Sequence, residues 1–292
     1  MVTIRWALAV AVLLPATATA QTAADHFRAG RAAMDSNKAD AAVKEFETAV
    51  SQEGANADYH LWLGRALGTV AQNASVLRQP FLAKRVKSEF ERTVALDPAN
   101  VGAHEGLVQF YLQAPGFMGG SIGKAREQAE AIARVAPLRG HMQRATIALH
   151  EKDSSTVERE FRAAAREFPD SLTAVATLAN YLATTNRADE AFGSLDAFLA
   201  RKPGEPLALF WVGRIAATTG KQLDRGEQAL RTVLALPGMG KDAALPAPAN
   251  VHFRLGDIAV KRGAKEVARR EYEEALKLNP KFEPARKALK AL

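Results

Sequence analysis

Ser121 is the residue whose neighbours come nearest to a catalytic pattern. Residues 119–123 read GGSIG, which has the G-x-S-x-G spacing in which a serine hydroxyl can serve as a nucleophile. That chemistry requires a strand before the serine, because the strained turn between strand and helix aims the hydroxyl. Here a helix-forming segment and the turn residues Pro115-Gly116 precede it. We therefore expect Ser121 to be an N-cap or loop residue and not a catalyst.

Histidine is the other residue type that could do chemistry, as a metal ligand or a general base. Five of the six histidines recur at one position of a repeat described below: His26, His60, His104, His141 and His252. Equivalent positions of stacked helix pairs lie about 10 Å apart, too far for ligands of one metal ion. We expect these side chains to be partly buried and to pair with a carbonyl or carboxylate of a neighbouring element.

The composition removes several further kinds of chemistry. No cysteine is present, which excludes disulfides, cysteine nucleophiles and Cys-ligated metal sites. No pair of carboxylates and no catalytic triad can be assembled from local spacing. The sequence therefore predicts a protein that is not an enzyme and that carries no cofactor and no metal.

The N-terminus has the layout of a cleavable signal peptide. A short basic start ending at Arg5 is followed by an apolar run over 6–15 and by the small residues 16–20, ATATA. The apolar run is shorter than the roughly 20 residues that a membrane-spanning helix requires. We expect cleavage after Ala20 and a periplasmic or secreted protein with no transmembrane segment in the mature chain.

The charge balance is basic, with 39 Lys+Arg against 32 Asp+Glu in 292 residues. Lys and Arg are mixed with acidic residues along helix-forming segments, as in residues 265–274, KEVARREYEE, which is typical of solvated helix faces. Mixed charges and the predicted export both argue against a nucleic-acid partner.

The sequence repeats internally, and the repeated helices must position any functional residue. Apolar residues at three- and four-residue spacing predict amphipathic helices over segments such as 39–51, 156–168 and 265–278. Prolines punctuate the chain, and Pro169, Pro203 and Pro237 stand 34 residues apart. A capping box at Ser155-x-x-Glu158 predicts a helix that begins there.

These features resemble the tetratricopeptide repeat (TPR) family over nearly all of residues 22–292. Its pattern W-x2-L-G-x2-Y…A-x3-F…P is matched near the C-terminus by His252, Leu255, Gly256, Ala268, Tyr272, Ala275 and Pro280, and near the start by Gly30, Ala42, Phe46 and Ala49. The resemblance implies an all-α fold, a right-handed α-solenoid of about seven TPR helix pairs. We place the repeats at about 22–56, 57–100, 101–137, 138–170, 171–204, 205–248 and 249–281, with a capping helix over 282–292. Together they would form one superhelical domain over 21–292.

Three insertions interrupt the period. They place residues 72–82 in a longer connection, add the PGFMGG loop over 115–120, and lengthen the linker over 238–250. Inserted loops of a solenoid emerge on one face, where they either bind a ligand or are simply tolerated. Residues 110–131 are also similar to a stretch of uncharacterised exported bacterial repeat proteins, which points toward the cell envelope.

The resemblance also implies a binding surface. In the TPR family the fifth and ninth positions of the first helix of each repeat line the concave face and commonly contact an extended peptide. The residues that we assign to partner binding on this basis are Phe27, Arg31, Arg65, Asn180, Phe210, Arg214 and Phe253. Arginines beside aromatic rings favour an acidic segment or a C-terminal carboxylate. The alternative is that these residues only cover the inner helix surface.

Three functions compete on this reading. The first is a secreted or periplasmic scaffold that binds protein or peptide through the concave face and the inserted loops. The second is a small-ligand-binding accessory of a periplasmic transport system, with a pocket closed by the loops over 115–120 and 238–250. The third, a hydrolase around Ser121, requires the strand that the sequence lacks.

Overall fold

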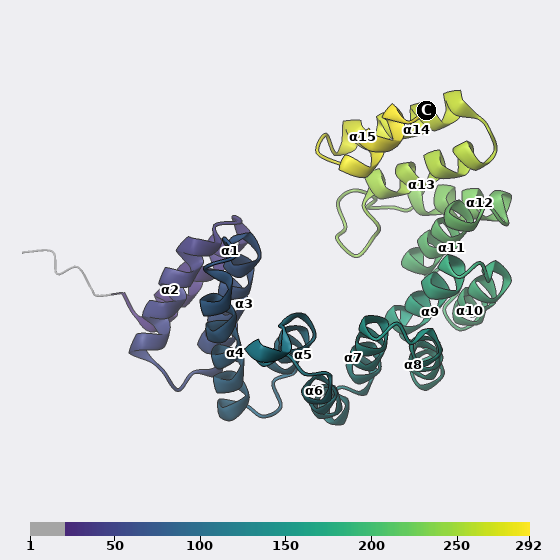
Figure 1. Ribbon diagram of the computed structural model, residues 1–292. Helices are drawn as coiled ribbons and strands as arrows, with labels where there is room; N and C mark the ends of the chain where they lie inside the picture. Colours follow the sequence, from purple (N-terminus) through teal and green to yellow (C-terminus); the bar gives the residue numbers. More distant parts are fainter. Residues whose placement is uncertain (1–20) are drawn as a thin grey trace, which may run out of the picture. The chain divides into compact units, whose positions relative to one another are not determined.

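The computed structural model describes residues 21–292, and in that part of the chain the secondary structure is entirely helical (Figure 1). The predicted signal peptide, residues 1–20, lies outside the described residues. The first compact unit ends at Gly120 and contains α1 (Ala23–Asp35), α2 (Ala39–Gln52), α3 (Ala57–Asn73), α4 (Gln79–Leu96), α5 (Val101–Gln113) and the 3-10 turn η1 (Gly116–Met118).

The second unit begins at Ser121. It contains α6 (Ile122–Val135), α7 (Pro137–His150), α8 (Ser154–Glu167), α9 (Leu172–Thr184), α10 (Ala188–Arg201), α11 (Pro206–Thr219), α12 (Leu223–Leu234), α13 (Pro248–Lys261), α14 (Lys265–Leu278) and α15 (Glu283–Lys290). The single domain expected over 21–292 stays a prediction.

Successive helices pack in pairs, as the repeat pattern predicts. In the first unit α1 packs on α2 and α3 on α4; in the second α7 packs on α8, α9 on α10, α11 on α12 and α13 on α14. The first helices of neighbouring pairs also touch, so that α11 lies between α9 and α13 (Figure 1). The chain is therefore an α-solenoid, with α15 packed on α14 at its C-terminal end.

Glycine at the eighth repeat position explains how the two helices of a pair come so close. A Cβ built on Gly64 of α3 would lie 2.8 Å from the ring of Phe90 on α4, closer than real Cβ contacts. A Cβ on Gly256 of α13 would collide in the same way with the ring of Tyr272 on α14. Only glycine leaves room for the ring, so these glycines fix the packing within the pair.

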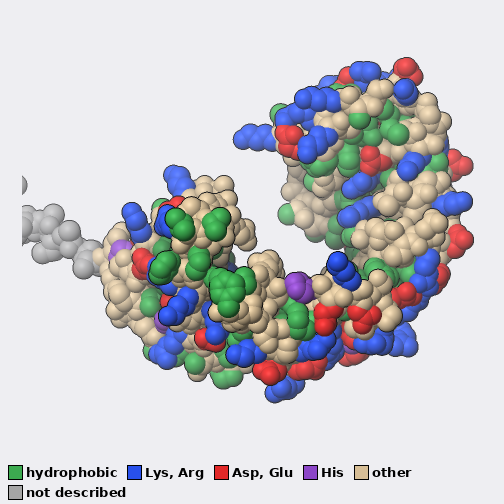
Figure 2. All heavy atoms as spheres, in the orientation of Figure 1, with side chains coloured by type: hydrophobic (Ala, Val, Ile, Leu, Met, Phe, Trp, Pro, Cys, Tyr) green, Lys and Arg blue, Asp and Glu red, His purple; other side chains and the backbone are tan. Residues whose placement is uncertain are grey.

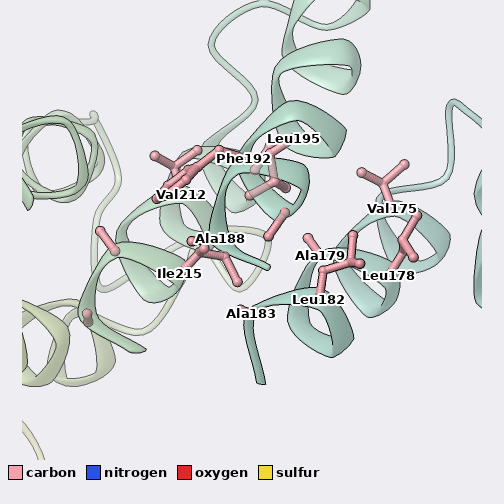
Figure 3. Close-up of a cluster of buried hydrophobic side chains, with 14 of the residues drawn as sticks. Val175, Leu178, Ala179, Leu182, Ala183, Ala188, Phe192, Leu195, Val212 and Ile215 are labelled. Atoms are coloured by element: carbon pink, nitrogen blue, oxygen red, sulfur yellow. The ribbon is translucent and has the colours of Figure 1, made fainter. Parts of the chain in front are cut away.

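The core of the second unit is built from small and branched side chains. Figure 3 shows Ala179 and Leu182 on the side of α9 that faces α10 and α11, which carry Phe192, Leu195 and Ile215 of the same cluster. Alanine fills the positions where helices approach most closely, and Ala179 and Ala191 are completely buried. A single helix pair could not bury these faces, which is why the pairs stack.

The five recurring histidines tie the elements together as predicted. His60 Nδ1 lies 2.6 Å from a carboxylate oxygen of Glu89, and its Nε2 lies 3.1 Å from the carbonyl oxygen of Gly54. The histidines of four helix pairs contact a glutamate of the second helix: His26–Glu45, His60–Glu89, His141–Glu160 and His252–Glu271, at 2.6–2.8 Å. His104 Nε2 contacts the carbonyl of Pro98 at 3.0 Å.

Two local predictions were wrong. The N-cap of α8 is Asp153, whose carboxylate accepts from the backbone N–H of Thr156, so Ser155 lies within the helix and forms no capping box. The insertion over 72–82 does not form a long connection either. It extends α3 to Asn73 and begins α4 at Gln79, because its residues continue the helical pattern on both sides.

Candidate functional site

Two arginines converge on one tryptophan in the first unit. The guanidinium carbon of Arg31, on α1, lies 3.8 Å from the centroid of the Trp62 ring, and that of Arg65, on α3, lies 4.8 Å from it. Arg31 Nε is buried and has no hydrogen-bond partner in the described part of the chain. We call Arg31, Trp62 and Arg65 the first arginine–tryptophan cluster.

The second unit contains a related arrangement with one arginine. The guanidinium carbon of Arg214, on α11, lies 4.4 Å from the centroid of the Trp211 ring, and its Nη2 donates to Asn180 Oδ1 of α9 at 3.4 Å. Within residues 21–292 no carboxylate pairs with Arg214. Burial lowers the pKa of its guanidinium, and the charge of Arg254 lowers it further. We call Asn180, Trp211 and Arg214 the second arginine–tryptophan cluster.

Both clusters contain the same four-residue pattern, W-x-G-R. Residues 62–65 read WLGR and residues 211–214 read WVGR, each at the sixth to ninth positions of its repeat. The tryptophan and the arginine are three residues apart and therefore share one helix face. The glycine between them faces the other helix of the pair, since a Cβ there would collide with Phe90 in α4 or with Leu230 in α12.

The first helix of the following pair, α13, carries an arginine that forms an ion pair within the same helix. Arg254 of α13 donates to Asp257 at 2.8 Å and also lies over the Phe253 ring at 4.8 Å. Asp257 accepts a second hydrogen bond, from the Tyr272 hydroxyl at 2.9 Å. Burial raises the pKa of Asp257 and that of Tyr272. This ion pair is satisfied within the protein, in contrast to Arg214.

The three phenylalanines assigned to partner binding pack within the protein. The Phe27 ring contacts Tyr59 at 4.9 Å between centroids, and Phe253 contacts Phe282 at 5.4 Å. Phe210 is half-buried against the core of the second unit. Each therefore has a structural role, and a role in binding stays a prediction.

An open groove lies beside the first cluster, with a cavity volume of about 880 Å³. α3 and α5 line it on either side of the Phe90 ring of α4, which forms its floor, and residues of η1 line it too. Figure 2 shows hydrophobic side chains gathered on the face of the first unit that is turned toward the viewer. Arg65 lines the groove, as do Phe117 and Met118 of the PGFMGG loop, whereas no residue of the 238–250 linker does.

Ser121, which the sequence singles out as a possible nucleophile, has a structural role. Ser121 is the N-cap of α6, and its hydroxyl accepts from the Lys124 backbone N–H at 3.3 Å, as predicted. Over the described residues no group of three or more potential ligands could hold a metal ion. In the same range, no helix has the length and apolar character needed to cross a bilayer.

Comparison with protein-family models matches tetratricopeptide repeats at residues 27–78, 177–237 and 249–282, just over half of the chain. The chain belongs to the TPR family. A TPR protein from Parabacteroides merdae is 15% identical, with 92% of this chain and 97% of that chain covered and a TM-score of 0.55. A thermophilic TPR protein from Thermus thermophilus is 18% identical, with 73% and 100% covered and a TM-score of 0.46. No curated protein sequence matches this chain.

Reasoning from TPR positions found the arginines and missed the tryptophans that hold them. Trp62 and Trp211 stand at the sixth position, which the fifth-and-ninth rule passes over. The signal was the W-x-G-R sequence, which occurs at the same register in two repeats. Of the seven residues assigned to partner binding, Arg31 and Arg65 meet at Trp62, and Asn180 and Arg214 meet beside Trp211.

Proposed function

We propose that this TPR protein is an exported, non-catalytic scaffold that binds an acidic segment of a partner protein through its arginine–tryptophan clusters. The observation that carries the proposal is the state of Arg31 and Arg214. Each is held beside a tryptophan ring, and neither has a carboxylate partner in the described part of the chain. Such residues are poised to receive an anion from outside.

The physical argument rests on partial burial. A guanidinium that has lost part of its hydration gains more from a carboxylate than one in open water does, because the local dielectric is lower. The lowered pKa of Arg214 reports the same desolvation. Arginine can also hold a carboxylate through two parallel hydrogen bonds, which suits an acidic side chain or a C-terminal carboxylate. Arginine and tryptophan are, in addition, the residues that most often dominate binding energy at interfaces.

The family supports the general part of this proposal. The TPR fold suggests a scaffold for protein–protein interaction, and its repeats are generally not catalytic. Export rests on the sequence of residues 1–20 alone, through the basic start, the short apolar run and the small residues before Gln21.

Binding is tested with defined peptides. A labelled acidic peptide of Asp, Ser and Gly residues is titrated with protein and compared with its Asn-for-Asp counterpart by fluorescence anisotropy. Each is made with a free and an amidated C-terminus, which separates side-chain from terminal carboxylates. We expect only peptides that carry a carboxylate to bind. Because hydrogen bonds to charged groups contribute about 1.5–3 kcal/mol, Arg214→Gln should weaken binding by roughly tenfold to a hundredfold.

Matched variants control for net charge. Lys44→Gln in the first unit and Lys221→Gln in the second remove one positive charge from an exposed position outside both clusters. They should leave binding within about twofold, since exposed charges act weakly at physiological salt. Equal losses in the control and cluster variants would reject the clusters as the site and leave only a general electrostatic attraction.

Export is tested separately. The full chain is expressed in a Gram-negative host, and the protein from the periplasmic fraction is sequenced from its N-terminus. We expect the mature chain to begin at Gln21. An intact N-terminus in the cytoplasmic fraction would overturn this part of the proposal without affecting the binding part.

A further inference from the structure

Four large apolar side chains of the first unit stand almost fully in solvent. Val76 and Leu77, in the connection before α4, are 79% and 86% exposed, and Phe81, in the first turn of α4, is 77% exposed. Phe117, the middle residue of η1, is 91% exposed. Val76 and Phe117 line the same groove, so the two segments lie side by side. We call these four residues the apolar tip.

The segment before α4 holds its apolar side chains on a helical backbone. The backbone N–H of Gln79 donates to the Ser75 carbonyl at 3.1 Å, which adds a helical turn ahead of α4, and Pro80 follows in the first turn of the helix. Leu77 and Phe81 are four residues apart and therefore share one face of this segment. Their exposure shows that no other part of the described chain covers this face.

The PGFMGG loop is closed by hydrogen bonds of its own. The N–H groups of Met118 and Gly120 donate to the Pro115 carbonyl at 2.9 and 3.1 Å. Gly120 comes so close to the preceding chain that a Cβ there would lie 1.8 Å from the carbonyl oxygen of Ala114. The turn thus presents Phe117 outward on an ordered backbone, and such preorganisation lowers the entropic cost of burying the ring against another surface.

The two segments that carry the apolar tip contain no negative charge. Residues 59–88 include no Asp or Glu, and residues 106–120 include no charged residue at all. Arg78 and Lys84 are exposed and form no ion pair in the described part of the chain. Lys84 follows Phe81 by three residues, so a free cation and an exposed ring share one face of α4. The tip therefore combines apolar side chains with unpaired positive charge.

We propose that the apolar tip docks this protein on the surface of an anionic lipid bilayer. Apolar side chains enter the boundary between headgroups and acyl chains, and each Lys or Arg near the surface gains from its negative potential. The long side chains of Arg78 and Lys84 can reach the headgroups while the neighbouring rings are buried. The inference goes beyond peptide binding, because it uses neither of the arginine–tryptophan clusters.

A fluid interface fits the apolar tip better than a folded partner does. A folded protein would have to offer a packed pocket to each projecting side chain, whereas lipid chains rearrange around all four. A second copy of this chain, seated tip to tip, would bring Arg78 and Lys84 against the same cations of its partner, and like charges repel. An anionic bilayer supplies both the apolar medium and the opposite charge.

Vesicle sedimentation tests the docking. We use the chain from Gln21 onward, which contains every described helix, so that the apolar run over 6–15 cannot itself enter the bilayer. The vesicles contain phosphatidylcholine alone or equal parts of phosphatidylcholine and phosphatidylglycerol. We expect binding to the anionic vesicles to be roughly tenfold or more tighter and to weaken as salt is added. Equal binding to both kinds of vesicle, or binding to neither, would overturn the inference.

Serine substitutions separate the apolar tip from the rest of the surface. The triple variant Leu77→Ser, Phe81→Ser and Phe117→Ser alters side chains that are already exposed, so its melting temperature should stay near that of the wild type. We expect it to bind anionic vesicles roughly a hundredfold less tightly. The matched control replaces three apolar residues of the second unit that are 49–56% exposed: Val135→Ser, Leu149→Ser and Leu278→Ser. Equal losses in the two triple variants would overturn the inference.

Charge substitutions test the electrostatic part. Arg78→Gln with Lys84→Gln should weaken binding to anionic vesicles by roughly tenfold and leave binding to neutral vesicles unchanged. Lys221→Gln with Lys241→Gln, two exposed lysines of the second unit, is the matched control and should stay within about twofold of the wild type. A loss of the same size in the control would assign the attraction to net charge and overturn the role of the tip.

Fluorescence shows whether the apolar tip enters the bilayer. Lipids with brominated acyl chains should quench the added indole of Phe117→Trp beyond the quenching of the wild type, and Leu149→Trp in the second unit should show no such increase. A bound Phe117→Trp without extra quenching would overturn insertion. A wild-type dimer in sedimentation velocity, lost in the serine variant and accompanied by no vesicle binding, would assign the tip to a second copy. Arg31→Gln should bind vesicles like the wild type, so that a failure of the proposed function is seen separately.

Discussion

The region of α3, α4 and α5 and the region of α9, α10 and α11 start from the same repeat and reach different surfaces. In the second region the first helices of neighbouring pairs pack directly, and alanines such as Ala179 and Ala216 are buried. In the first, α3 and α5 pack on each other less, and the ring of Phe90 lies between Gly64 and Gly106. One region carries the second arginine–tryptophan cluster on directly packed helices, and the other carries an open groove.

Helix length accounts for this difference. α3 and α4 have 17 and 18 residues, whereas α9 and α10 have 13 and 14. The connection between the two longer helices carries the exposed Val76, and the first turn of α4 carries the exposed Phe81. An insertion that lengthens both helices therefore adds lining residues to the groove and leaves the repeat contact between Gly64 and Phe90 in place.

The largest expected effect comes from removing the floor of the groove. Phe90 is 6% exposed and packs against two glycines, so Phe90→Ala should destabilise the protein by about 3–5 kcal/mol. Phe192→Ala, at 1% exposure in the second unit, should cost about the same. Urea unfolding measures the free energy of unfolding of both variants. An unchanged unfolding midpoint in either variant would contradict the burial of its ring.

Alanine scanning of two glycines should give effects of opposite sign. Gly213→Ala in α11 drives a methyl group into Leu230 and should cost about 1–3 kcal/mol. Gly68→Ala in α3 meets no atom within 4 Å and should stabilise the protein by about 0.5–1 kcal/mol, because alanine favours the helix. Thermal unfolding measures both shifts. A destabilised Gly68→Ala would mean that the wall of the groove is closed in solution.

Histidine–glutamate pairs occur in both units, and we expect them to stabilise the fold by different amounts. His60→Phe removes two hydrogen bonds, to Glu89 and to the Gly54 carbonyl, and leaves a half-buried carboxylate without its partner. We expect a loss of about 1–3 kcal/mol. His252→Phe removes only the contact to Glu271 and should cost about 1 kcal/mol. Denaturant titration of both variants checks the order, and the reverse order would reject the role of the second hydrogen bond.

The sequence predicts the parts of this structure that depend on the period. The 34-residue spacing and the eighth-position glycines are sufficient to place helix pairs, and recurrence at one register is sufficient to assign the histidines to packing. Both follow from local geometry, because a residue at a fixed position of a repeated helix meets the same neighbour each time. The N-cap at Asp153 was missed because two adjacent polar residues offered competing caps.

The groove and the clusters depend on contacts between repeats, which the period alone does not encode. Arg31 reaches Trp62 from the preceding helix pair, and no spacing rule within one repeat pairs these two residues. The groove also required α3 to continue through residues that looked like a loop. The sequence therefore predicts the individual arginines of the clusters but not their contacts with the tryptophans.

The smallest expected effect is a pH dependence confined to an exposed ion-pair network of the second unit. Glu190 of α10 accepts from Arg187 at 2.6 Å and from Arg162 of α8 at 2.6 Å. These hydrogen bonds lower the pKa of Glu190 from 4.5 to about 2. Because the folded-state pKa is depressed, the stabilisation is fully present above pH 4.5 and is lost as the pH falls toward 2. The melting temperatures of wild type and Glu190→Gln should therefore differ most at neutral pH and converge near pH 2. Solvent exposure keeps the difference small, and a constant difference across that range would show that the variant acts through packing and not through charge.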